Sequence, residues 1–149
     1  MTYSADLAPA GSRPTARELM IPPDAAVSAG TTVAEVIEVL LTRHARHLVV
    51  TDDEGRCLAV LGPRQLAVVH HLRPGQSPDT PVEALELGAG TALAPDDDIA
   101  RCAQILVDHD LDAVPVLDAE RHVLGLVTVH AVVRAAAYPS APAESRPAA

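Results

Sequence analysis

Residues 113–128 read AVPVLDAERHVLGLVT, two short apolar runs separated by a polar segment. Residues 113–117 and 123–128 are rich in Val and Leu, which suits buried strands. Asp118 and the polar residues that follow it are typical of a turn. The stretch therefore predicts a strand, a turn and a second strand.

Helical patterns flank these strands on both sides. Before them, Asp98 suits the N-cap of a helix. The apolar residues that follow it recur at helical spacing: Ile99, Cys102, Ala103, Leu106 and Val107. After them, a second helix is predicted from Val132, Val133 and Ala136. With a short strand around Leu93, this half of the chain has the predicted order β-α-β-β-α.

The same order of signals occurs 66 residues earlier in the chain. Val33 aligns with Ile99, and the offset continues without a gap through both predicted strands. Thr32 then corresponds to the N-cap, and Val27 to the first strand. A closing helix is predicted from Leu66, Val69 and His70. The chain is therefore predicted to contain two β-α-β-β-α repeats.

Composition supports this fold class. The chain has no Phe, no Trp and only two Tyr, so packing falls to Leu, Val, Ile and Ala. These residues suit buried strands covered by closely packed helices, which predicts an α/β (α+β) fold. We expect a frayed tail at 1–14, the first repeat at 15–73, a linker at 74–81, the second repeat at 82–137 and a frayed tail at 138–149.

Charge and cysteine usage exclude several classes of partner. The formal net charge is −9 and the 11 basic residues are all Arg, which opposes binding to nucleic acid. No apolar run approaches the roughly 18 residues of a membrane span and no secretory signal is visible, so we expect a cytoplasmic protein without membrane association. Cys57 and Cys102 lie within apolar patterns and are predicted to be core residues, not zinc ligands or a disulfide.

The two units resemble the CBS family, named after cystathionine beta-synthase, whose repeat is a β-α-β-β-α unit. The second unit is the closer match, through residues 93–95, 99–100, 113–118 and 123–128. The first unit departs from it at four positions, where Ala29, Val49, Ala59 and Gly62 replace Pro95, Pro115, Gly125 and Thr128.

The resemblance implies an arrangement and a function. It implies that the two units pack through their sheets with approximate two-fold symmetry, and that the pair associates into a homodimer. It also implies a regulatory role, with AMP, ATP or S-adenosylmethionine bound in the cleft between the units. No nucleophile has a base at a recognisable spacing, so we expect no catalytic residue and no enzyme activity.

The family's ligand signature lies where the last strand enters the last helix. It reads Gly, two apolar residues, Thr or Ser, two further residues and then Asp, and the carboxylate accepts hydrogen bonds from ribose. The second unit keeps Gly125 and Thr128 but has Ala131 at the carboxylate position. The first unit has Gln65 there, which can still hydrogen-bond to ribose without charge.

Arg64 and His130 occupy equivalent positions in the first turn of the closing helices. A positive side chain there opposes the helix dipole, and a bound anion would account for both residues. Exposed side chains with a small local cost would account for each residue alone, so both interpretations stay open.

The remaining candidate ligand contacts lie beside the predicted strands. Arg46 and His47 precede a strand that borders the family's cleft, and Val114 and Pro115 lie in its counterpart in the second unit. Asp96–Asp98 begin a helix, where carboxylates serve as caps, so we predict no metal site.

Two functions remain open from the sequence. The first is a stand-alone regulatory module that binds an adenosine-containing ligand and signals to an unidentified protein partner. The second is a degenerate pair that has lost its ligand and serves as a dimerisation or protein-docking platform. The retained Arg64 and His130 favour the first, whereas Gln65 and Ala131 favour the second.

Overall fold

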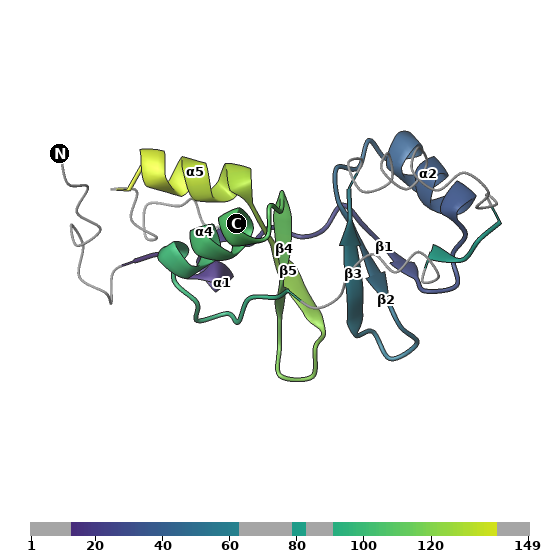
Figure 1. Cartoon of the computed structure of the whole chain (residues 1–149), viewed down its shortest axis with the longest axis horizontal. Coiled ribbons are helices and arrows are strands. Elements are labelled where there is room, and N and C mark those ends of the chain that lie inside the picture. The colour runs from purple at the N-terminus through teal and green to yellow at the C-terminus, as the bar shows by residue number, and fades with distance from the viewer. Residues whose placement is uncertain (1–12, 63–78, 83–90, 140–149) are drawn as a thin grey trace, which may run out of the picture.

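The computed structural model describes residues 13–62, 79–82 and 91–139 (Figure 1). The helix predicted from Leu66, Val69 and His70 lies outside the described residues, as do most of the predicted linker and of both predicted tails. The described helices and strands, in chain order, are α1 (Ala16–Leu19), β1 (Ala25–Ser28), α2 (Val33–Thr42), β2 (Leu48–Thr51), β3 (Cys57–Leu61), α4 (Ile99–Asp108), β4 (Ala113–Leu117), β5 (Val123–Thr128) and α5 (Val129–Ala137).

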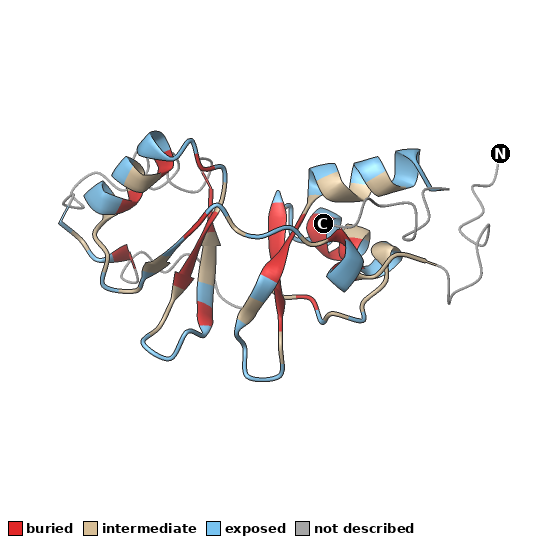
Figure 2. Cartoon of the chain, turned by 180° about the vertical axis from the view of Figure 1, so that it is seen from behind, coloured by how far each residue is buried: buried red, intermediate tan, exposed pale blue. Residues whose placement is uncertain are grey.

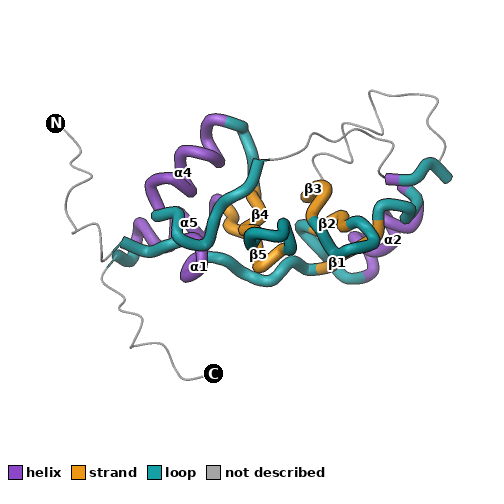
Figure 3. Tube along the Cα trace, turned by 90° about the horizontal axis from the view of Figure 1, so that it is seen from below, coloured by secondary structure: helices purple, strands orange, loops and turns teal. Residues whose placement is uncertain are grey.

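The molecule has two lobes whose sheets face each other. Helices lie on the outside of each lobe and strands in the middle, as Figures 1 and 3 show from two directions. One sheet has the order β1-β2-β3, with β1 parallel and β3 antiparallel to β2. The other is the antiparallel pair β4-β5. The predicted α/β class is confirmed.

The strand predicted around Val27 is present as β1, but the one predicted around Leu93 is a single parallel bridge to Val116. The carboxylate of Asp97 accepts a hydrogen bond of 2.8 Å from the amide of Ala94, which starts a turn. Pro95 then has no N–H to continue a ladder. The chain therefore leaves the sheet directly after Leu93.

Both predicted N-caps are confirmed. The Thr32 hydroxyl accepts from the amide of Glu35 at 3.2 Å, and the Glu35 carboxylate accepts from the amide of Thr32 at 3.3 Å, a complete capping box. Asp98 accepts from the amide of Arg101 at 2.9 Å. Asp97 and Asp98 therefore serve as turn and cap residues, as their position at a helix start predicts.

Successive side chains of a strand point to opposite faces of its sheet, and this alternation divides the buried side chains into three clusters. Leu48 and Val50 of β2 face α2, whereas Val49 faces the opposite sheet. Val114 and Val116 of β4 face the helices of their own lobe. The cluster between the sheets consists of Val49, Cys57, Leu117 and Leu126. Figure 2 shows this burial along the strands and exposure on the outer faces of the helices.

The two repeats exchange their leading segments. The amide of Ala16 donates to Asp97 O at 2.7 Å, so the start of the first repeat packs on the second. The amide of Val82 donates to Thr31 O, also at 2.7 Å, so the start of the second repeat packs on the first. Ala16 and Val82 are both buried.

The exchanged contacts obey the same offset of 66 residues that aligns the repeats. Ile99 N donates to Pro14 O at 2.9 Å, and its counterpart Val33 N donates to Thr80 O at the same distance. The approximate two-fold symmetry implied by the resemblance is therefore present in the main-chain hydrogen bonds. The exchange itself was not predicted, because it joins segments far apart in the sequence.

A tight approach of chain segments occurs at Gly125. Ile21 and Leu126 exchange two main-chain hydrogen bonds of 2.8 Å, which add residue 21 to the free edge of β5. A Cβ atom on Gly125 would lie 2.9 Å from Cβ and Cγ of Met20 and 3.0 Å from Ile21 O. Only glycine leaves room for this crossing segment.

We expect Gly125→Ala to lower the free energy of unfolding by about 1–3 kcal/mol, the usual cost of overpacking. The matched control is Gly30→Ala, because a Cβ there meets nothing within 4 Å. Urea unfolding followed by circular dichroism measures both. Equal midpoints for the two variants would contradict the close approach.

Candidate functional site

The two sheets have two distinct ends. At one end lie the turns 52–56 and 118–122, which we call the hairpin edge. At the other end β2 and β4 begin and β5 runs into α5, and we call this the strand-start edge (Figure 1). Arg46, His47, Thr128 and His130 lie at the strand-start edge, whereas Arg64 and Gln65 lie outside the described residues.

Thr128 joins β5 directly to α5. It is the last residue of β5 and the N-cap of α5, and its hydroxyl accepts a hydrogen bond from Ala131 N at 3.1 Å. Asp112 O accepts from Val129 N at 3.0 Å. Two of the first three helix amides are thus occupied within the protein, and the third belongs to His130, whose side chain is exposed.

Asp24 holds the chain that carries Arg46 and His47. One oxygen of its carboxylate, Oδ2, accepts from both amides, at 2.8 Å from Arg46 N and 3.3 Å from His47 N. Asp24 directly precedes β1, which is parallel to β2, so this contact fixes the entry to both strands. The Arg46 side chain is exposed and His47 is half-buried. The role of Asp24 was missed in the sequence, where nothing near it indicates a contact 22 residues away.

The electrostatics of His47 connect the two repeats. Burial lowers the pKa of its imidazole, while the carboxylates of Asp112 and Asp24 act in the opposite direction and Arg46 adds to the lowering. Asp112 belongs to the second repeat and precedes β4. The ring is therefore predominantly neutral at pH 7 and available as a hydrogen-bonding group, so positive charge at this edge comes from other residues, such as Arg46.

Val114 and Pro115 occupy opposite faces of β4. Val114 is fully buried among the residues beneath the helices, so only its main chain could meet a ligand. Pro115 is buried on the face that also carries Leu117, toward the first sheet. The main-chain oxygen of Pro115 faces Leu93, whose amide donates to it at 2.9 Å, and an N–H at position 115 would face the same side. Because that side is not the one that pairs with β5, the proline removes no hydrogen bond from the β4–β5 ladder.

Comparison with known proteins agrees with the repeat structure. The family model of the CBS domain matches two segments, residues 16–69 and 91–138. The chain belongs to the CBS domain family. The magnesium transporter MgtE of Thermus thermophilus is 32% identical over 122 residues, which cover 77% of this chain. The match spans about a quarter of that transporter (25%).

Two solved structures have the same fold as this CBS pair. The cytosolic domain of the Mg²⁺ channel MgtE in complex with ATP is 30% identical, covers 77% of this chain and 46% of its own, and gives a TM-score of 0.62. A CBS domain protein from Pyrobaculum aerophilum complexed with AMP is 18% identical, covers 79% and 89%, and gives a TM-score of 0.69. Within the described ranges, no helix of this CBS pair combines the length and apolar character of a membrane span.

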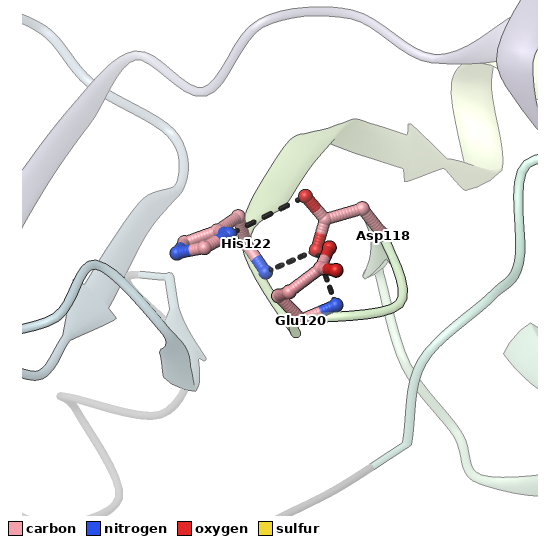
Figure 4. A group of neighbouring side chains, drawn as sticks. All are labelled: Asp118, Glu120 and His122. Atoms are coloured by element: carbon pink, nitrogen blue, oxygen red, sulfur yellow. Dashed lines mark hydrogen bonds and ion pairs between the residues drawn. The ribbon is translucent and has the colours of Figure 1, made fainter.

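The hairpin edge carries a polar cluster that the sequence analysis did not single out (Figure 4). Asp118, Glu120 and His122 bring one side-chain oxygen or nitrogen each within 4.8 Å of the others. We assign no metal to them, because the hydrogen bonds of an ordinary turn account for their positions. The Asp118 carboxylate accepts from the amides of Glu120 and His122 at 2.9 and 2.8 Å, and the matching turn of the first repeat closes with Arg56, which is not a metal ligand.

The two cysteines are buried free thiols, as their apolar surroundings predict. Burial raises the pKa of Cys57, and burial together with the carboxylates of Asp97 and Asp98 raises the pKa of Cys102 to about 11. A protonated thiol buried in this way behaves as a small apolar side chain and is a poor nucleophile.

The pKa of Cys102 predicts a loss of stability in alkaline solution. The thiol of the unfolded chain ionises near its ordinary value of 9.0, whereas the folded thiol holds its proton up to about 11. Between these values the free energy of unfolding should fall by about 1.4 kcal/mol per pH unit relative to Cys102→Ala. Urea unfolding of both proteins from pH 8 to 11 measures the difference, and parallel profiles would contradict the raised pKa.

Proposed function

We propose that this CBS pair is a non-catalytic regulatory module that binds an adenosine-containing ligand between its repeats at the strand-start edge. The observation that carries the proposal is the match to the ATP-bound cytosolic domain of MgtE, which at 30% identity covers 77% of the chain. The AMP-bound protein from Pyrobaculum aerophilum supports the fold alone. A ligand at this edge would touch residues of both repeats and so couple them.

Each candidate residue has a chemically suitable role in this proposal. The Thr128 hydroxyl accepts from Ala131 N and keeps its own proton to donate to a phosphate or ribose oxygen. His130 offers a side chain and a main-chain amide at the positive end of α5. Arg46 and Arg64, both of the first repeat, would supply charge, and neutral His47 would supply a hydrogen bond to the base or the sugar.

The missing carboxylates define the expected specificity. Ala131 cannot accept a hydrogen bond from ribose through its side chain, and Gln65 accepts without charge. Binding then depends more on the phosphate contacts of Arg64 and His130 than on the sugar. The ligand would regulate by binding one arrangement of the pair more tightly than another, and a partner protein would respond to that arrangement.

Calorimetric titration of the full chain with AMP, ATP and S-adenosylmethionine tests this proposal. We expect the phosphate-bearing nucleotides to bind more tightly than S-adenosylmethionine. His130→Ala should weaken the Kd for ATP about tenfold, the equivalent of about 1.4 kcal/mol, because it removes a hydrogen-bonding side chain at the helix start. The matched control is Arg134→Ala, which removes an exposed cation from the later part of the same helix.

The outcomes of this titration are distinguishable. An unchanged Kd in His130→Ala would show that a nucleotide binds but that its site does not include the start of α5. No heat and no thermal stabilisation by any of the three ligands at millimolar concentration would contradict the proposal as a whole.

A second function, a platform for dimerisation or protein docking that has lost its ligand, is favoured by Gln65 and Ala131. In that case the oligomeric state would not respond to nucleotides. A nucleotide retained through purification, seen by native mass spectrometry, would overturn this second function.

We also propose that the pair forms a homodimer through the outer faces of its helices. Leu41 of α2 and Val107 of α4 are 70% and 77% exposed, and they correspond to each other at the repeat offset. On α5, Val129 and Val133 are also exposed, and they lie one turn apart on the same side of that helix. An apolar surface repeated by internal symmetry suits a second copy of this chain, because a two-fold contact uses the same surface on both partners.

Substituting both residues, Leu41→Asp and Val107→Asp, should convert the dimer to a monomer, because four carboxylates would enter the apolar contact. Light scattering after size-exclusion chromatography would then give the mass of one 15.5 kDa chain, not of two. The control is Ala119→Asp, which adds charge at the exposed hairpin turn. A dimer that survives the double substitution would place the interface elsewhere.

A further inference from the structure

The hairpin edge is built from two turns of the same design. In each, an aspartate accepts from the amides two and four residues later: Asp52 at 2.9 Å from both, and Asp118 at 2.9 and 2.8 Å. The fourth residue of each turn has a positive φ, 81° at Gly55 and 69° at Arg121. These bonds lower the pKa of Asp52 and Asp118, so both carboxylates are ionised at neutral pH.

The turns differ in the residue that closes them. In the first repeat, Arg56 forms ion pairs of 2.9 Å with Asp52 and with Glu54, both of its own turn. In the second repeat, His122 takes the place of Arg56. Arg56 and His122 also form a β-bridge with each other, and because they correspond at the repeat offset, this bridge lies at the pseudo-two-fold axis.

The His122 side chain contacts both turns of the hairpin edge. Its Nδ1 faces Asp118 Oδ2 at 3.3 Å, and its Nε2 lies 3.1 Å from the main-chain oxygen of Glu54 in the other repeat. Both neighbours are acceptors. A neutral imidazole has one N–H and can satisfy only one of them, whereas an imidazolium donates to both.

The charged groups around His122 come from both turns. Its own turn contributes the carboxylates of Asp118 and Glu120 and the guanidinium of Arg121, whose Nη2 donates to Cys57 O at 3.4 Å. The other turn contributes Asp52, Glu54 and Arg56, which are paired with one another. Carboxylates therefore outnumber guanidinium groups around the ring, which complements a cation.

We propose that His122 is a protonation-dependent clasp between the two repeats. The imidazolium ties the carboxylate of its own turn to the main chain of the first repeat's turn, and loss of the proton releases one of these two contacts. The hairpin edge is then held more tightly in mildly acidic than in mildly alkaline solution. The inference does not depend on a ligand, because it rests only on residues of the hairpin edge.

Hydrogen exchange followed by NMR tests the clasp at the amide of Cys57. This amide of the first repeat donates to Arg121 O, in the turn of the second repeat, at 2.9 Å. From pH 5.5 to 8, we expect its protection factor to fall about threefold to fivefold in the wild-type protein, the range for one modest hydrogen bond. In His122→Arg the charge is permanent and the protection should stay at the acidic value. In His122→Gln it should stay at the lower, alkaline value.

The amide of Val50, within the first sheet, reports changes in global stability, and its protection should be the same in all three proteins. Retention of Val50 protection also shows that each variant folds. A wild-type profile that matches His122→Gln at every pH, or a His122→Arg profile that falls like the wild type, would overturn the proposal.

Discussion

The reciprocal exchange of leading segments is the constraint on which the structure depends. Neither repeat is complete in itself, because Ala16 and Leu19 fill the core of the second repeat and Val82 fills that of the first. The amides of Ala16 and Val82 each find an acceptor only in the other repeat's helix-start turn. A chain with this arrangement folds as a pair, since separating the repeats would expose apolar surface and leave main-chain donors without partners.

Internal symmetry then determines where the two repeats meet. The contact between the sheets is aliphatic, and it is closed at one end by hydrogen bonds between the hairpin turns. The far end of the same strands carries the N-terminus of α5 and the entry to β2, which Asp24 holds in place. A ligand bound at the strand-start edge and the contacts of the hairpin edge therefore act on opposite ends of one interface. This arrangement suits a regulatory module, in which small changes in the spacing of two rigid units are the signal.

Because the two repeats share one backbone plan, residues at equivalent positions can be compared directly, and their differences are informative. Pro115 replaces Val49 where the ladder needs no N–H, and Arg121 takes a left-handed conformation where the first repeat has Gly55. His122 replaces Arg56, which changes a permanent charge into a titratable one at the symmetry axis. At the corresponding positions of the ligand signature the copies carry Ala131 and Gln65, so they differ in this part of the sequence as well as at the hairpin edge.

The sequence by itself determined the repeat, its offset, the α/β class, the caps Thr32 and Asp98 and the burial of both cysteines. These features are local, because periodicity, turn residues and capping depend on neighbours along the chain. Of the candidate site, the position of Thr128 and His130 at the start of α5 was predictable, whereas the electrostatic interaction of His47 with Asp112 of the second repeat was not. Only the tertiary structure decided the exchange of segments, the two contacts of Asp24 and the hydrogen bond from His122 to Glu54. Each of these joins residues whose separation along the chain leaves no local pattern. The contacts of Asp24 depend on the pairing of β1 with β2, and the other two depend on how the two repeats are placed against each other.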